Sequence, residues 1–117
     1  MHSEAFAAGE LKHGPIALID KQTLVVAIAS MPDLYDKIGS NMQEVRTRGA
    51  SVLVITQDKT DAFAGKIDEA FVIPDCSEVT ASLLTIIPAQ LFAYYCSILR
   101  GIDPDKPRNL AKSVTVE

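Results

Sequence analysis

The sequence is poor in the residues that build disulfide frameworks, zinc sites and nucleic-acid interfaces. Only two of its 117 residues are cysteine and none is tryptophan. Cys76 and Cys96 form no CxxC pair, which argues against a disulfide scaffold or a metal site. Eleven basic residues stand against fifteen acidic ones, so no overall positive field is available to attract a phosphate backbone. We therefore expect a cytoplasmic protein with no metal and no nucleic-acid partner.

Signals for phosphate loops, secretion and membrane spans are also lacking. No GxGxxG or Walker-type segment occurs. The first residues include Glu4 and Glu10 and show no basic run followed by an apolar stretch, so no secretory signal is visible. The longest uncharged run, residues 83–99, contains Pro88 and Gln90 and is short beside the roughly 20 residues that a membrane helix needs. It predicts a buried helix rather than a membrane anchor.

Apolar residues make up 48% of the chain and charged residues 22%, which is typical of one folded domain over residues 1–117. Residues 24–29 and 51–56 are continuous β-branched and aliphatic runs, and residues 69–73 form a shorter one. Continuous apolar runs are typical of strands buried on both faces of a parallel sheet. The sequence therefore predicts three parallel strands.

Helical patterns separate and follow these strands. Apolar residues recur at helical spacing from residue 34 to residue 48, after a capping segment and before Gly49. Residues 58–66 predict a loop with a helical turn, and residues 79–100 predict a long helix that Pro88 kinks or splits. Strands alternating with crossover helices predict an α/β sandwich built on a parallel sheet.

Two segments contain groups able to do chemistry. Glu10, Lys12 and His13 place a carboxylate, an amine and an imidazole within four residues, before Gly14-Pro15 ends any helix. Histidine is the side chain that exchanges protons near neutral pH. A solvated histidine at a capped helix end explains the same pattern, and a polar terminus such as residues 106–117 is commonly a frayed tail. Composition alone leaves both segments open, with Glu10 and Lys12 expected as supporting or surface groups.

The two segments together point further. Residues 4–19, 41–49, 88–95 and 107–117 closely resemble the C-terminal part of the family of glucosamine-fructose-6-phosphate aminotransferases (isomerizing). Within them, Gly-Glu-Leu-Lys-His-Gly-Pro near one end and Asn-Leu-Ala-Lys-Ser-Val-Thr-Val-Glu at the other occur in the family's order. The resemblance covers essentially the whole chain.

The resemblance implies the second sugar isomerase (SIS) half of that family's isomerase domain, an α/β three-layer sandwich with a parallel sheet, here truncated at its amino end. It implies a transferase of amino-sugar biosynthesis that makes glucosamine 6-phosphate from fructose 6-phosphate and glutamine, without a cofactor. By position, His13 corresponds to the histidine that opens the sugar ring for the neighbouring subunit of a dimer, and Lys112 to the lysine that forms a Schiff base with the open ketose. Ala111 lies at the sugar, within an active-site tail at 103–117.

Other parts of that enzyme are missing from the sequence. The amidotransferase domain with its cysteine nucleophile, the phosphate loop of the first SIS half and the glutamate that moves the proton between C1 and C2 all lie outside it. We therefore expect the chain alone to be inactive, with the remainder of the enzyme as its partner. A non-catalytic SIS module that binds a sugar phosphate and a deglycating enzyme are the alternatives. The tail around Lys112 favours the isomerase, since a binding module does not need that lysine.

Overall fold

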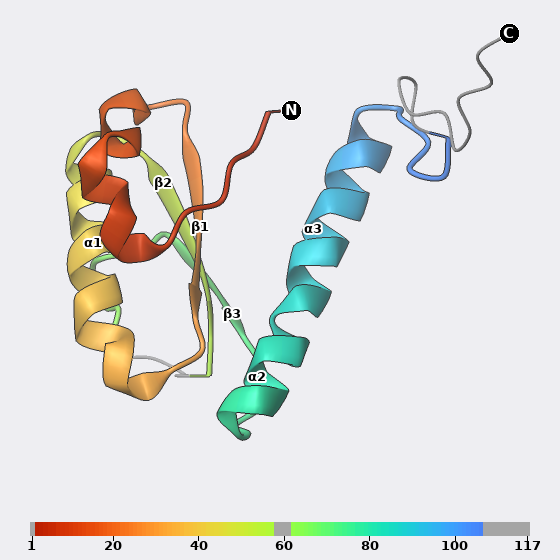
Figure 1. Cartoon of the computed structure of the whole chain (residues 1–117). Coiled ribbons are helices and arrows are strands. Elements are labelled where there is room, and N and C mark those ends of the chain that lie inside the picture. The colour runs from red at the N-terminus through yellow and green to blue at the C-terminus, as the bar shows by residue number, and fades with distance from the viewer. Residues whose placement is uncertain (1, 58–61, 107–117) are drawn as a thin grey trace, which may run out of the picture. The chain divides into compact units, whose positions relative to one another are not determined.

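The computed structural model describes residues 2–57 and 62–106 (Figure 1). Contacts divide the chain into two units, Met1–Thr85 and Ile86–Glu117. The elements in chain order are the 3₁₀ helices η1 (Ala8–His13) and η2 (Pro15–Leu18), β1 (Leu24–Ala29), η3 (Pro32–Leu34), α1 (Tyr35–Thr47), β2 (Ser51–Thr56), β3 (Glu69–Val72), α2 (Glu78–Leu84) and α3 (Ile86–Leu99). The three strands and α1 begin and end within one residue of the bounds that the sequence predicts, so these predictions are confirmed.

The sheet is parallel and has the strand order β1-β2-β3. Leu24 pairs with Ser51 at one end of β1, and Leu53 pairs with Glu69 where β3 begins. Helix α1 connects β1 to β2, as a parallel pair requires, because its strands cannot be joined by a tight turn. The predicted parallel α/β arrangement is therefore confirmed for this unit.

Helix α1 covers one face of the sheet. Met42 and Val45 on the helix are buried in the same cluster as Val52 and Val54 of β2. From β1, Ala29 is buried in this cluster and Val25 and Ala27 pack against it. Phe63, which follows β2 in the chain, is also buried in the cluster. Full burial of a valine or methionine side chain contributes about 1.5–3 kcal/mol, so this cluster is the main stabilising core of the unit.

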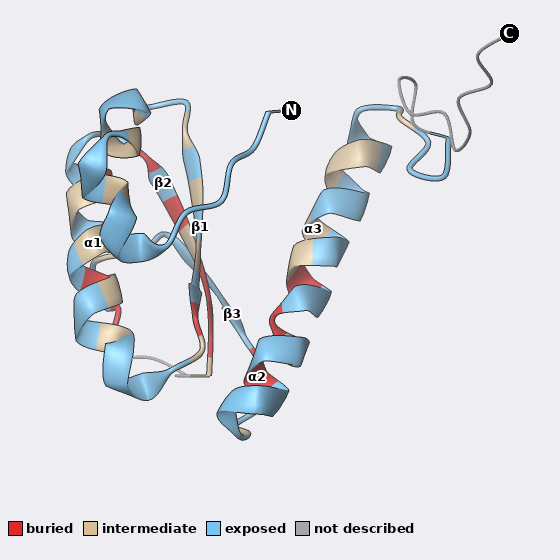
Figure 2. Cartoon of the chain, viewed as in Figure 1, coloured by how far each residue is buried: buried red, intermediate tan, exposed pale blue. Residues whose placement is uncertain are grey.

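The opposite face of the sheet is only partly covered, which corrects the prediction of strands buried on both faces. In β1, Leu24, Val26 and Ile28 are all exposed, and all four residues of β3 are exposed (Figure 2). On that side of β2, Ile55 packs against Ile73 and Ala81 in a small second cluster. Continuous apolar sequence marks a strand that is suited to burial, but a covering element has to be present to provide it.

The long apolar segment near the carboxyl end is split, as expected, but at Thr85 rather than at the proline. Pro88 has no N–H for the carbonyl of Leu84, and its ring crowds that carbonyl, so α2 ends at Leu84. In α3 the proline occupies the first turn, where its missing N–H has no helical partner to lose. Ser77 caps α2 by accepting a hydrogen bond from the backbone N–H of Thr80.

Only Pro88 is buried in α3, which differs from the predicted buried helix (Figure 2). The stretch Glu78–Leu99 is long and apolar enough to cross a membrane by length and composition. Within it, 11% of the most apolar 18-residue segment is buried. A helix that is apolar on all sides needs partners on several faces. Length and composition by themselves do not separate a membrane span from a helix that packs between protein elements.

Candidate functional site

The Glu10–His13 segment lies in η1, a short 3₁₀ helix on the surface of the first unit. It ends where the sequence predicts, because Gly14 adopts φ 144°, a conformation that side chains with a Cβ rarely take. Pro15 then starts η2, where its fixed φ suits the first helical position. The break directs the chain away immediately after His13 and leaves this side chain at the end of η1.

His13 is paired with Glu10 one turn earlier. The two atoms His13 Nδ1 and Glu10 Oε2 lie 3.0 Å apart, and the side chains are 70% and 67% exposed. An ionised carboxylate only accepts hydrogen bonds, so with Glu10 ionised Nδ1 is the donor of this contact, and in a neutral ring Nε2 is then an acceptor. The arrangement presents a base to the outside of the unit, held by a carboxylate as in many proton-transfer sites.

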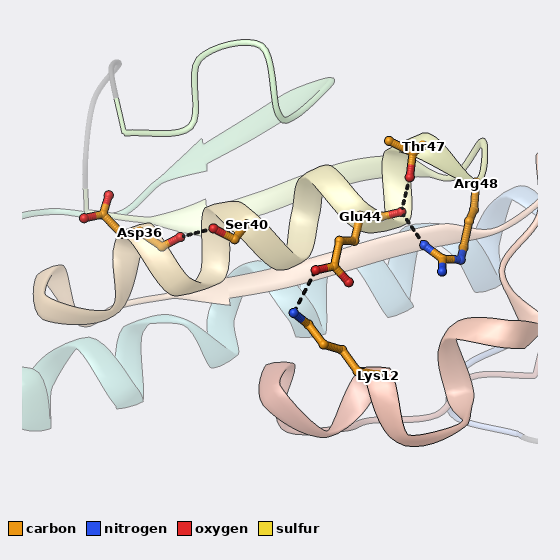
Figure 3. A network of polar contacts seen from close by, with 6 residues as sticks. All are labelled: Lys12, Asp36, Ser40, Glu44, Thr47 and Arg48. Carbon is orange, nitrogen blue, oxygen red and sulfur yellow. Dashed lines mark hydrogen bonds and ion pairs between the residues drawn. The ribbon is translucent and has the colours of Figure 1, made fainter.

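Lys12 connects the same segment to α1. Its Nζ lies 2.7 Å from Oε1 of Glu44, with side chains 50% and 38% exposed (Figure 3). The backbone carbonyl of Glu44 accepts hydrogen bonds from Thr47 Oγ1 at 2.7 Å and from Arg48 at 3.0 Å. These bonds occupy a carbonyl in the last turn of α1, where helical partners run out. Glu44 therefore contacts Lys12 from the last turn of α1.

A second polar arrangement joins the carboxyl ends of the strands. The side-chain amide of Gln57, directly after β2, donates to the carbonyl of Ser30 at 2.7 Å. Its oxygen accepts from the backbone N–H of Cys76 at 2.8 Å. Gln57 therefore connects the backbone after β1 with the backbone after β3, at the carboxyl edge where α/β folds commonly bind ligands.

The structure describes only some of the site residues that the sequence predicts. His13 lies at the end of η1, beside Glu10, while Ala111 and Lys112 lie outside the described residues. Within residues 2–57 and 62–106, no group of three or more His, Cys, Asp or Glu side chains is arranged to hold a metal ion. Sequence reasoning missed Glu44, whose only signal was its place in the helical segment 41–49 that resembles the aminotransferase family.

Comparison with known proteins agrees with the parallel α/β fold and with the resemblance of residues 41–49. Residues 1–100 match the family of SIS domains. The chain belongs to the SIS domain family. The C-terminal domain of glucosamine-fructose-6-phosphate aminotransferase from Francisella tularensis has a similar structure, with a TM-score of 0.75 and 35% sequence identity over 87% of this chain and 29% of that one. This SIS domain thus resembles part of the larger C-terminal domain of such an aminotransferase, as the sequence predicted.

Three curated relatives of this SIS domain share one name. The glutamine–fructose-6-phosphate aminotransferases (isomerizing) of Clostridium tetani and Symbiobacterium thermophilum are each 52% identical to it over 117 residues. The corresponding protein of Methanosarcina acetivorans is 50% identical. Each alignment covers the whole of this chain and 19% of the relative, so the SIS domain spans about a fifth of the length of these proteins.

Proposed function

We propose that this SIS domain is the C-terminal isomerase part of a glutamine–fructose-6-phosphate aminotransferase, a cytoplasmic enzyme. The observation that supports the proposal most is 52% identity to such an enzyme along all 117 residues. The chain covers 19% of that relative, and we expect the full reaction to need parts that lie outside it. The product would be glucosamine 6-phosphate, with fructose 6-phosphate and glutamine as substrates. Free thiols at Cys76 and Cys96 suit a reducing compartment.

Two residues would act on the sugar. His13 would open the furanose ring by taking the proton of the anomeric hydroxyl and returning a proton to the ring oxygen, and its Nε2 is the acceptor that the Glu10 contact leaves available. The amine nitrogen of Lys112 would then add to C2 of the open ketose, and loss of water would give an imine. A protonated imine withdraws electrons from C1 and so eases removal of a proton there. Ala111 would lie beside the bound sugar.

Assembly with further protein is part of the proposal. The exposed face of β1 presents Leu24, Val26 and Ile28, and both β1 and β3 are edge strands. Open apolar faces and unpaired edges favour association with another chain. We propose that the enzyme is a homodimer whose remaining domains cover such surfaces, and that α3 packs against protein rather than lipid. A single sharp monomer of the full-length enzyme in analytical ultracentrifugation at high concentration would contradict the dimer.

Trapping the imine tests the catalytic role of Lys112. Borohydride reduces an imine to a stable amine, so fructose 6-phosphate added to the full-length enzyme should become attached to Lys112, as peptide mass analysis would show. Lys112→Arg should abolish isomerisation and leave glutamine hydrolysis measurable, because a guanidinium keeps the charge but forms no imine under these conditions. Label on another lysine, or unchanged sugar turnover in this variant, would refute the assignment.

The 117-residue chain alone should make no glucosamine 6-phosphate from the two substrates. Catalysis by the proposed route needs a phosphate site and an ammonia source, and the resemblance places both in the rest of the enzyme. Purified chain, free of host enzyme, should therefore show no product above the background of a matched preparation of Lys112→Arg. Turnover that disappears in this variant would show that the chain is sufficient and would overturn the expectation.

A further inference from the structure

The segment that presents His13 has few attachments to the rest of its unit. Five of the six residues of η1 are exposed. The sixth, Leu11, is partly buried and packs against the apolar cluster between α1 and the sheet. A polar contact to α1 is the ion pair of Lys12 with Glu44 at 2.7 Å (Figure 3). Leu11 fixes the depth of the segment by apolar packing, which is not directional. The ion pair adds a directional contact between η1 and the last turn of α1.

We propose that Glu44 is a positioning residue for His13, acting through Lys12. This inference rests on the proposed function, in which His13 opens the sugar ring. Lys12 and His13 are adjacent in the chain, so a change in the position of the Lys12 backbone moves the His13 backbone with it. The backbone carbonyl of Glu44 accepts hydrogen bonds from the side chains of Thr47 and Arg48, and these bonds hold the backbone that carries its carboxylate. It needs no contact with the sugar to affect ring opening.

The expected effect is small and selective. Half-exposed ion pairs contribute modestly, and loss of this one should lower the equilibrium constant for correct placement of His13 about two- to fivefold. A displaced base slows the step that uses it, since proton transfer depends on hydrogen-bond distance. Steps carried out by other residues should be unaffected. Removal of Glu44 should therefore slow ring opening while later steps keep their rates.

The test uses the full-length enzyme and two substrates. Fructose 6-phosphate must be opened, whereas 5-deoxyfructose 6-phosphate lacks the hydroxyl that closes the furanose ring and is always open. Glu44→Gln should lower kcat/KM for fructose 6-phosphate about two- to fivefold and leave kcat/KM for the 5-deoxy substrate unchanged. Combining Lys12→Glu with Glu44→Lys should restore much of the loss, because the pair reforms with its charges exchanged. Thermal unfolding of every variant checks that it is folded.

Two further variants complete the test. Asp36→Asn removes a carboxylate from the same helix. In the described residues this carboxylate makes no hydrogen bond or ion pair, and the bond from Ser40 drawn in Figure 3 goes to the backbone carbonyl of Asp36. It should leave kcat/KM for both substrates unchanged. His13→Gln should impair turnover of fructose 6-phosphate more than that of the 5-deoxy substrate, which checks the proposed function independently.

The outcomes are distinguishable. If His13→Gln shows the selective loss and Glu44→Gln does not, only the positioning role is wrong. Equal losses on both substrates in Glu44→Gln, or no recovery when the charges are exchanged, also overturn it. If His13→Gln turns over fructose 6-phosphate like the unaltered enzyme, the proposed role of His13 fails and the positioning role fails with it.

Discussion

The carboxylate of Asp68 accepts a hydrogen bond from the backbone N–H of Val52 at 2.7 Å. In return, the backbone N–H of Asp68 donates to the carbonyl of Val52 at 2.9 Å. The second carboxylate oxygen lies 3.1 Å from Arg46 on α1. One side chain thus joins the start of β3 to β2 and to the helix, at a point where regular strand pairing has not yet begun.

Asp68→Ala should destabilise the first unit by about 1 kcal/mol. The variant leaves the N–H of Val52 without its acceptor, and the half-exposed site lets water replace part of what is lost. Urea unfolding should show a lower midpoint with an unchanged slope. Asp75→Ala is a suitable control, because Asp75 is exposed and its side chain has no partner in the described residues. Equal shifts in both variants would contradict the role assigned to Asp68.

Gln57→Ala should also lower stability, by about 1–3 kcal/mol, because it removes both the donor to Ser30 and the acceptor for Cys76. The sharper measurement is amide hydrogen exchange, which should become faster at Cys76 than at residues in the middle of β2. Gln22→Ala removes an exposed amide and should change neither quantity. Unchanged exchange at Cys76 would show that the Gln57 contact does not protect this N–H.

Gly49 should not tolerate a side chain. Its φ is 101°, and an added Cβ would lie 2.7 Å from Cγ of Lys21. Gly49→Ala should cost about 1–3 kcal/mol through backbone strain, with the lysine moving to relieve the contact. Gly9→Ala is the matched control, since nothing lies within 4 Å of a Cβ there. Thermal unfolding compares the two, and a loss in Gly49→Ala no larger than in Gly9→Ala would be inconsistent with strain.

Asp20 should make stability depend on pH in acid. Hydrogen bonds from the backbone N–H of Gln22 and from the side chain of Thr23 hold the pKa of Asp20 below its ordinary value of 3.8. Its contribution to stability is therefore complete above pH 3.8 and is lost as the pH falls through the lowered pKa of the folded state. Asp20→Asn should unfold with a weaker dependence on pH in this range. Identical pH profiles for both proteins would exclude a contribution from Asp20.

The sequence by itself determined the local secondary structure and the resemblance of the chain to the aminotransferase family. The apolar runs 24–29 and 51–56 became β1 and β2 without change of boundary, because β-branched and aliphatic side chains fit a pleated strand that packs against neighbouring side chains. Gly14-Pro15 ended η1 for an equally local reason. His13 was recognised within a contiguous motif, which needs no knowledge of the fold.

Tertiary structure decided which surfaces are covered and which distant side chains meet. Whether Val26 is buried depends on an element packing over it, and strand sequence contains no information on whether that element is present. The pairs Lys12 with Glu44 and Val52 with Asp68 depend on how α1 and β3 lie against their neighbours. Polar residues on a solvated surface have many possible partners of opposite charge, and only the packing of the apolar cores selects among them.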